Sequence, residues 1–92
     1  MKNYLIQYES TVDWKKLQKL SKDELYKIEK DIASRLGTHP EIFGKPLRKS
    51  LKGYRRLRIG NRIRAIFRIE EQKVVIVFIG EKPNVYKEYL KK

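Results

Sequence analysis

Residues 53–69 read GYRRLRIGNRIRAIFRI, and in this stretch apolar residues alternate with arginines. A period of two is typical of β-strands whose two faces meet different surroundings. The dipeptide Gly60-Asn61 interrupts the alternation and suits the positive backbone dihedrals of a tight hairpin turn. The stretch therefore predicts two adjacent antiparallel strands, Tyr54–Ile59 and Arg62–Ile69.

A third strand is predicted immediately downstream. Residues Val74–Ile79 are continuously apolar and mostly β-branched, a pattern typical of a central strand that is covered on both faces. Glu71-Gln72 supplies the turn that joins this strand to the previous one. The three strands form a meander, and a short C-terminal helix that starts near Pro83 follows them.

The N-terminal half predicts a strand and then a helix. Residues 3–9 alternate enough to form a short strand at a sheet edge or next to one. One face of this strand carries Tyr4, Ile6 and Tyr8, and the other carries Leu5 and Gln7. Ser10 or Thr11 can cap the first helix. The core face of that helix consists of Trp14, Leu17 and Leu20.

A second helix completes a helical hairpin. It begins at a capping box formed by Ser21 and Glu24. Its apolar stripe consists of Leu25, Ile28, Ile32 and Leu36. Gly37 suits a left-handed C-terminal cap. Residues 38–53 contain two prolines and two glycines, so they predict a long connection with at most one short turn of helix.

Together these elements predict a single α+β domain over residues 1–92, with the N-terminal strand, a helical hairpin packed on an antiparallel sheet, the three-strand meander and a short C-terminal helix. The chain has no cysteine, which excludes disulfides and zinc-thiolate sites. Its apolar run at residues 74–80 is far shorter than the ~20 residues of a membrane-spanning helix, and its N-terminus lacks the apolar core of a signal peptide. We therefore expect a soluble, cytoplasmic protein.

Positive charge is concentrated in the middle of the chain. The formal net charge is +12, yet residues 1–43 and 69–92 each contribute only +1. The remaining +10 lies in residues 44–68, which contain no acid. A polyanionic partner is the usual physical reason for a folded domain to tolerate such self-repulsion, and a solubilising surface is the alternative.

Alternation places the strand arginines on one face of the sheet. Arg56 and Arg58 point one way, while Leu57 and Ile59 point the other. On the next strand the arginine side holds Arg62, Arg64, Ile66 and Arg68. Because the apolar set must face the helices, we expect the arginines to lie together on the free face, where opposed like charges call for an anion. A solvated outer face is the alternative interpretation.

At this point the sequence resembles a known family. The segments KPLRKSLKGYRRLRIGNRIRAIFRI at residues 45–69 and VVIVFIGEKPNVY at residues 74–86 are similar to the RelE/ParE toxin superfamily. The resemblance implies a bacterial or archaeal toxin of a type II toxin–antitoxin system, held inactive by an acidic antitoxin encoded beside it. RelE-like members cut messenger RNA in the ribosomal A site without a metal, using the RNA's own 2′-hydroxyl as nucleophile. ParE-like members instead poison DNA gyrase.

The resemblance also implies a catalytic set. Its members are Arg56, Arg58, Arg64, Lys82 and Tyr86. The chain departs from the family pattern in several places: lysines are commoner at positions 56 and 58, arginine is usual at position 82, Pro83 follows it directly, and Arg62 replaces a common tyrosine. These departures bear on rate and substrate preference more than on the class of activity.

Metal-free RNA cleavage needs a base for the 2′-hydroxyl, charge stabilisation for the phosphorane and an acid for the 5′-oxygen. Arginine cannot be the base, because its pKa exceeds ~12. We therefore assign Arg64 and Lys82 to the scissile phosphate. Tyr86 is the hypothetical base, with packing on the sheet as the alternative, and Lys82 or a nearby arginine is the acid. Arg56 and Arg58 would hold phosphates and stack on bases.

Other polar residues are given lesser roles. Seven cations are predicted to follow the RNA backbone or to be merely solvated: Lys45, Arg48, Lys49, Lys52, Arg55, Arg62 and Arg68. His39 is the only histidine, but it lies far in sequence from the basic strands. No cofactor and no metal site are expected, since the acids of the second helix are typical of a solvated polar face.

Three functions are compatible with the sequence: a ribosome-dependent mRNA endonuclease, a gyrase-binding inhibitor without turnover, and a nucleic-acid-binding module without cleavage. The presence of the whole catalytic set favours the endonuclease. The expected partners are an acidic, partly disordered antitoxin and the 30S ribosomal A site with its mRNA and rRNA. The free toxin is expected to be a monomer.

Overall fold

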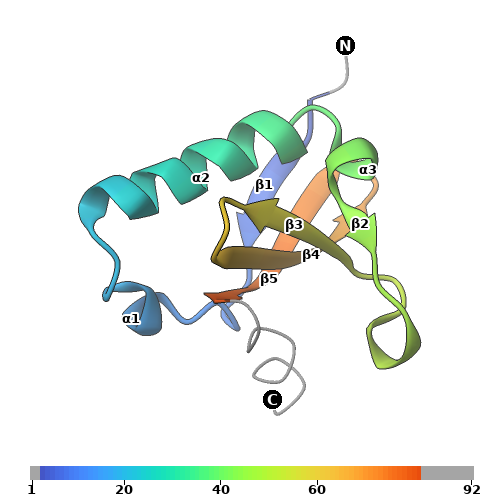
Figure 1. Cartoon of the computed structure of the whole chain (residues 1–92). Coiled ribbons are helices and arrows are strands. Elements are labelled where there is room, and N and C mark those ends of the chain that lie inside the picture. Colours follow the sequence, from blue (N-terminus) through green and yellow to red (C-terminus); the bar gives the residue numbers. More distant parts are fainter. Residues whose placement is uncertain (1–2, 82–92) are drawn as a thin grey trace.

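The computed structural model describes residues 3–81, which form an α+β domain with helices on one face of a five-stranded sheet (Figure 1). The helical segments are α1 (Trp14–Leu17), α2 (Lys22–Leu36), α3 (Pro40–Phe43) and the 3₁₀ turn η1 (Lys49–Leu51). The strands are β1 (Leu5–Tyr8), β2 (Lys45–Pro46), β3 (Arg55–Ile59), β4 (Ile63–Glu70) and β5 (Lys73–Glu81). None of the helices in this part of the chain is long and apolar enough to cross a bilayer. The expected C-terminal helix falls outside the described residues.

The sheet has the strand order β1-β5-β4-β3-β2. Strands β3, β4 and β5 form the predicted antiparallel meander, and β5 lies inside the sheet as its apolar sequence predicted. The expectation of a wholly antiparallel sheet was wrong at one edge, because β1 runs parallel to β5. After β1 the helical segments carry the chain to the opposite edge of the sheet, where β2 lies. From there β2, β3, β4 and β5 alternate in direction, so β5 ends up beside β1 and parallel to it.

The β3–β4 turn differs from the prediction in detail. Only Gly60 has a positive φ, of 64°, and the residue after it does not. The paired residues Ile59 and Ile63 enclose three loop residues, so Arg62 lies in the turn and not in a strand. Glycine relieves the strain at the single left-handed position.

Helix α2 supplies most of the helical contribution to the core. Its capping box is present: the Ser21 hydroxyl accepts from the Glu24 amide at 3.1 Å, and the Glu24 carboxylate accepts from the Ser21 amide at 3.3 Å. The predicted stripe is inward, with Ile28, Ile32 and Leu36 buried against the sheet. The left-handed cap predicted at residue 37 was wrong, because Gly37 has a right-handed φ of −70°. A side chain there would meet the Ala33 carbonyl oxygen.

The first helix is shorter than predicted and is capped by another residue. It makes one turn, and the Lys16 amide donates to the Asp13 carboxylate at 3.2 Å. Thr11, a predicted cap, instead donates its hydroxyl to the Val77 carbonyl and so ties the loop to β5. Trp14 is 39% exposed and packs its ring on Tyr8, with centroids 5.2 Å apart, so it is only partly a core residue.

The connection before β3 holds more structure than expected. It contains the helical turns α3 and η1 and the two-residue strand β2, where at most one turn was predicted. A proline at the first position of α3 explains why a helical turn forms there, since its missing N–H costs nothing at that position. This connection delivers β2 to the outer edge of β3.

Burial of Tyr8 has a consequence at alkaline pH. Burial, with a smaller contribution from Glu29, raises the pKa of the Tyr8 phenol to about 12. An unfolded tyrosine titrates near ~10, so between these values the unfolded chain loses its proton first and the free energy of unfolding falls as pH rises. We expect Tyr8→Phe to remove a step near pH 12 from an ultraviolet tyrosinate titration. As a control, replacing the exposed Tyr26 by phenylalanine should leave that step in place. If the step near pH 12 persisted in Tyr8→Phe, it would not belong to Tyr8.

Candidate functional site

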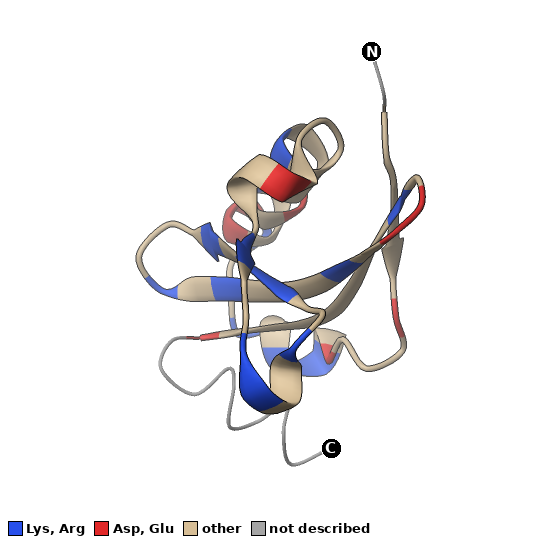
Figure 2. Cartoon of the chain, turned by 90° about the vertical axis from the view of Figure 1, so that its right-hand side faces the viewer, with Lys and Arg blue, Asp and Glu red and all other residues tan. Residues whose placement is uncertain are grey.

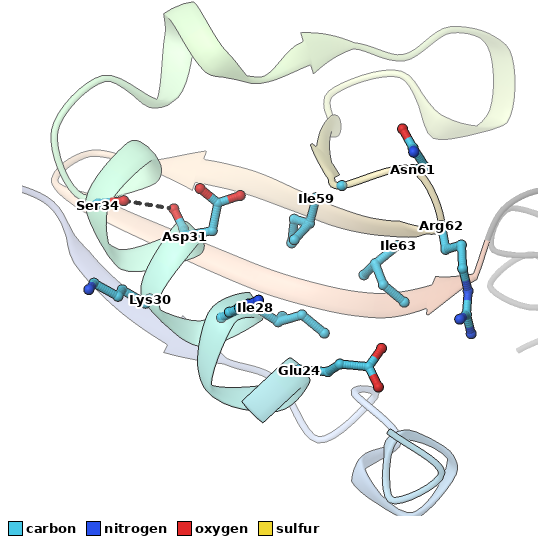
Figure 3. Close-up of a pocket in the computed structure, with 11 residues that line it drawn as sticks. Glu24, Ile28, Lys30, Asp31, Ser34, Ile59, Asn61, Arg62 and Ile63 are labelled. Atoms are coloured by element: carbon cyan, nitrogen blue, oxygen red, sulfur yellow. Dashed lines mark hydrogen bonds between the residues drawn. The ribbon is translucent and has the colours of Figure 1, made fainter. Parts of the chain in front are cut away.

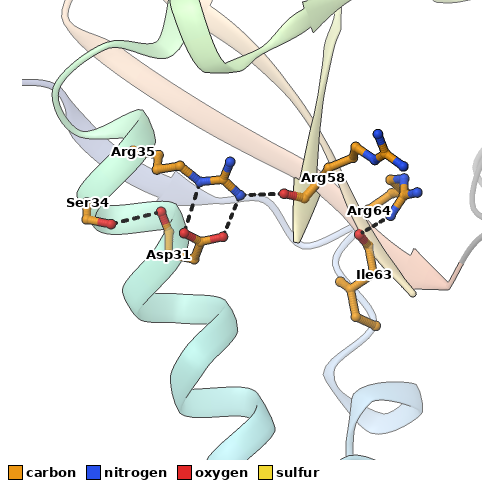
Figure 4. A network of polar contacts seen from close by, with 6 residues as sticks. All are labelled: Asp31, Ser34, Arg35, Arg58, Ile63 and Arg64. Carbon is orange, nitrogen blue, oxygen red and sulfur yellow. Dashed lines mark hydrogen bonds and ion pairs between the residues drawn. The ribbon is translucent and has the colours of Figure 1, made fainter. Parts of the chain in front are cut away.

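Strands β3 and β4 bring three predicted catalytic arginines onto one face of the sheet. Arg58 is the direct cross-strand partner of Arg64, and Arg56 is the partner of Ile66. Directly opposed residues of an antiparallel pair point to the same side. Figure 4 shows the side chains of Arg58 and Arg64 next to each other and directed away from α2. We call Arg56, Arg58 and Arg64 the arginine face.

The three arginines differ in exposure, and the expectation of a fully open face is corrected here. Arg58 is exposed and Arg56 half-buried, but Arg64 is only 2% exposed. Its guanidinium donates to the Ile63 carbonyl oxygen at 2.9 Å. The same side of the sheet holds a second hydrophobic cluster. Its members are Ile66, Val75, Val77 and Phe78, with Leu47 and Tyr54 packed against them.

Two other cations near the arginine face, one on β3 and one in the β3–β4 turn, make contacts elsewhere. Arg55 points to the opposite face and donates to the Gly44 carbonyl at 3.0 Å, which fastens β3 to the start of β2. Arg62 pairs with Glu81 at 3.0 Å in an exposed ion pair. These two therefore lie outside the arginine face.

Arg68 lies on the same side of β4 as Arg64 but nearer the other end of the strand. It pairs with Glu9 at 2.9 Å and also with Glu70. The hydrogen bond to Glu70 is the main cause that raises the pKa of Arg68, and the same contact lowers the pKa of the Glu70 carboxyl. The charge of Arg68 is thus compensated by acids of the protein itself.

The predicted loop cations continue the positive surface beyond the arginine face. Lys45 on β2 is the cross-strand partner of Arg56 and is exposed, so it extends the face by one strand. Three further cations around η1 are also exposed: Arg48, Lys49 and Lys52. Figure 2 shows positive residues on β3, β4 and this connection, whereas α2 carries both positive and negative residues and acidic residues lie at the β4–β5 turn.

Two members of the predicted catalytic set, Lys82 and Tyr86, lie outside the described residues. The last described strand leads toward the arginines, because Gly80 is the cross-strand partner of Arg64 and Glu81 that of Ile63.

Two residues near the arginine face, Tyr54 and Arg35, were not predicted from the sequence. Tyr54 lies two residues before Arg56 and is half-buried beside the second cluster. The alternation of the strand could have placed it on the same face as Arg56 and Arg58. Arg35 on α2 donates to the backbone carbonyl of Arg58 (Figure 4). Its spacing from Asp31 predicts a helix-surface pair, but nothing in the sequence indicates the contact with β3.

The opposite side of the sheet has a different character. A groove of about 660 Å³ lies between α2 and the β3–β4 turn, with Ile28, Ile59 and Ile63 among its lining residues (Figure 3). Its charged lining residues include Glu24 and Asp31, but among residues 3–81 no group of His, Cys, Asp or Glu side chains could hold a metal ion. The groove thus combines apolar and charged side chains.

Comparisons with known proteins agree with this architecture. The family model described as "ParE toxin of type II toxin-antitoxin system, parDE" matches residues 7–86. A chain of the toxin–antitoxin complex RelBE2 from Mycobacterium tuberculosis is 27% identical, with a TM-score of 0.78, over 89% of this chain and 94% of that chain. No curated protein matches the sequence.

Two further solved structures share the fold. The YoeB/ParE toxin from Agrobacterium tumefaciens is 21% identical, with a TM-score of 0.63, over 88% of this chain and 98% of that chain. YafQ from E. coli is 20% identical, with a TM-score of 0.62, over 86% of this chain and 93% of that chain.

Proposed function

The chain belongs to the ParE toxin family of type II toxin–antitoxin systems, and we propose that it acts as a ribosome-dependent endonuclease that cuts messenger RNA in the A site. The observation that best supports this proposal is the direct opposition of Arg58 and Arg64 on one sheet face, with Arg56 beside them. Two guanidinium groups at neighbouring positions repel each other, and a phosphodiester between them would relieve that repulsion.

In the proposed reaction the 2′-oxygen of the RNA attacks the adjacent phosphorus and the 5′-oxygen leaves. A 2′,3′-cyclic phosphate forms on one fragment and a 5′-hydroxyl on the other. Negative charge grows on the non-bridging oxygens during this step, and preorganised cations that are partly removed from water stabilise it best. The buried Arg64 meets this condition, and the exposed Arg58 adds a second planar donor group beside it.

The remaining cations have supporting roles in this proposal. Arg56 and Lys45 would hold phosphates flanking the scissile one, since contacts to the backbone fix register. Arg48, Lys49 and Lys52, which lie around η1, would contact the RNA backbone farther from the scissile phosphate. Arg55, Arg62 and Arg68 make contacts within the protein, so we assign them a smaller share of RNA binding than their charge alone predicts.

Tyr86 is proposed as the general base and Lys82 as the group nearest the leaving oxygen. Replacing Tyr86 by phenylalanine removes only the hydroxyl, and we expect single-turnover cleavage to slow by about 10² to 10⁴, the usual contribution of a general base. The measurement is a quench-flow time course on programmed ribosomes. A wild-type cleavage rate in Tyr86→Phe would exclude this tyrosine as the base. It would not test the roles of the arginines.

We also propose that the natural partner is an acidic antitoxin encoded beside this protein. RelBE2 from M. tuberculosis and DinJ-YafQ from E. coli are toxin–antitoxin complexes with this fold. For the present chain, the local excess of cations in residues 44–68 is the physical reason to expect an acidic segment. Such a segment would cover the arginine face or lie next to it.

Gyrase inhibition is the second candidate, and the match to the ParE family model is the observation that favours it. In that case the arginine face is a docking surface, and no RNA is cut.

Toeprinting separates the two candidates. Ribosomes with a defined A-site codon should yield new 3′ ends within that codon when the wild-type protein is added, while gyrase supercoiling in a parallel assay stays unchanged. Intact message together with loss of supercoiling would replace the first candidate by the second.

A further inference from the structure

The outer edge of β3 is only partly covered by β2. Strand β2 begins at Lys45, opposite Arg56, and runs antiparallel to β3 toward Arg55, so Arg58 lies beyond the beginning of β2. An uncovered strand edge leaves backbone groups that need hydrogen-bond partners. At this edge the carbonyl oxygen of Arg58 accepts a hydrogen bond from the Arg35 guanidinium, which reaches across from α2 (Figure 4).

The guanidinium of Arg35 is itself held in a fixed orientation. Its Nε and Nη2 atoms donate to the two carboxylate oxygens of Asp31 at 2.9 and 2.5 Å. Its plane also lies near the Phe43 ring, with 5.6 Å between the guanidinium carbon and the ring centroid. Bidentate geometry fixes direction as well as distance. Arg35 therefore links α2 and α3 to the backbone of β3 at Arg58 itself, whose side chain belongs to the arginine face.

We propose that Arg35 is a positioning residue for the arginine face, acting through the backbone of Arg58 on the cleavage of RNA. Arg35 holds the peptide on one side of the sheet, and the Arg58 side chain leaves on the other side next to Arg64. A displacement of about 1 Å in a catalytic group can cost about 10²-fold in rate. This inference rests on the proposed endonuclease function.

A double-mutant cycle tests whether Arg35 acts through Arg58. We expect Arg35→Ala to slow single-turnover cleavage by about 10²-fold, but to cause little further loss in a protein that already carries Arg58→Ala. Lys30→Ala is the matched control, since it removes one cation from the same helix. An equal loss from Arg35→Ala in both backgrounds would overturn the inference. If Arg35→Ala does not fold, Arg35→Lys, which keeps the charge but cannot form the fork to Asp31, replaces it in the same cycle.

A second readout needs neither ribosomes nor RNA. In ¹⁵N NMR spectra of the free protein, the side-chain Nε–H signals of Arg58 and Arg64 should shift or broaden in Arg35→Ala and stay in place in Lys30→Ala. Unchanged signals of both arginines in Arg35→Ala would overturn the inference. This readout distinguishes it from the proposed function: a protein that cuts no RNA would contradict the function, whereas the NMR comparison would still decide whether Arg35 positions the face.

Discussion

Arg58→Ala is expected to abolish most of the cleavage activity while the protein stays folded. Arg58 is exposed and lies opposite the buried Arg64, so its removal takes a cation from the scissile phosphate without opening the core. Loss of one such preorganised electrostatic contact typically costs about 10² to 10³ in kcat. The measurement is single-turnover cleavage of an A-site codon, with circular dichroism as the test of folding.

Lys73→Ala is a suitable control for this prediction. Lys73 is an exposed strand cation at the first position of β5, so the control removes the same charge at a distance from the arginine face. We expect it to cleave at close to the wild-type rate. Equal rates for Arg58→Ala and the wild-type protein would show that the face does not touch the reacting phosphate. Equal losses in both variants would show that only the total charge matters.

Phe67→Ala is expected to cause the largest loss of stability. Phe67 is fully buried in the main cluster, and its ring packs so closely on Gly44 that a Cβ there would lie 2.2 Å from the ring. Truncating a buried phenylalanine costs about 3 to 5 kcal/mol in the free energy of unfolding. A domain of this size has roughly 5 to 14 kcal/mol in total, so much of the margin would disappear.

Urea unfolding measures this effect, and Phe43 provides the comparison. Phe43 is 42% exposed at the end of α3, and its replacement by alanine should cost about 1 kcal/mol or less. If both variants unfolded at the same urea concentration, the packing of Phe67 between the sheet and the Gly44 backbone would not be the dominant contribution that the structure indicates.

The parts of the fold that the sequence predicted well depend on local patterns. The alternation in residues 54–69 sets which face each strand residue occupies, and β3 and β4 follow it. The capping box at Ser21 and Glu24 involves residues three apart, so their neighbours along the chain determine it. The opposition of Arg58 and Arg64 follows from the same alternation once the turn closes at Gly60.

The parts that the sequence did not predict depend on contacts between distant segments. The burial of Arg64, and the second cluster that Val75 and Phe78 of β5 complete from another strand, both depend on tertiary packing. The contact between Arg35 and the Arg58 carbonyl joins a helix to a strand edge that β2 leaves uncovered. Thr11 offered the same local cap as Asp13, and only its bond to β5 decides between them. Residue types alone contain no signal for such tertiary contacts.

The positions of the charged residues were predictable only in part. The distribution of charged residues along the sequence located the excess charge in residues 44–68. The structure then showed that Arg62 and Arg68 pair with acidic residues of the protein. A run of like charge therefore predicts an anion-binding region, but the individual residues that bind the anion depend on the tertiary fold.

The role of the RNA 2′-hydroxyl can be tested on programmed ribosomes whose A-site codon contains a single 2′-deoxy nucleotide. We expect the wild-type protein to cut the all-ribose codon, to leave a 5′-hydroxyl on the downstream fragment, and not to cut after the 2′-deoxy position. Unchanged cleavage at that position would mean that the 2′-hydroxyl is not the nucleophile, and it would contradict the chemistry assigned to Arg58 and Arg64.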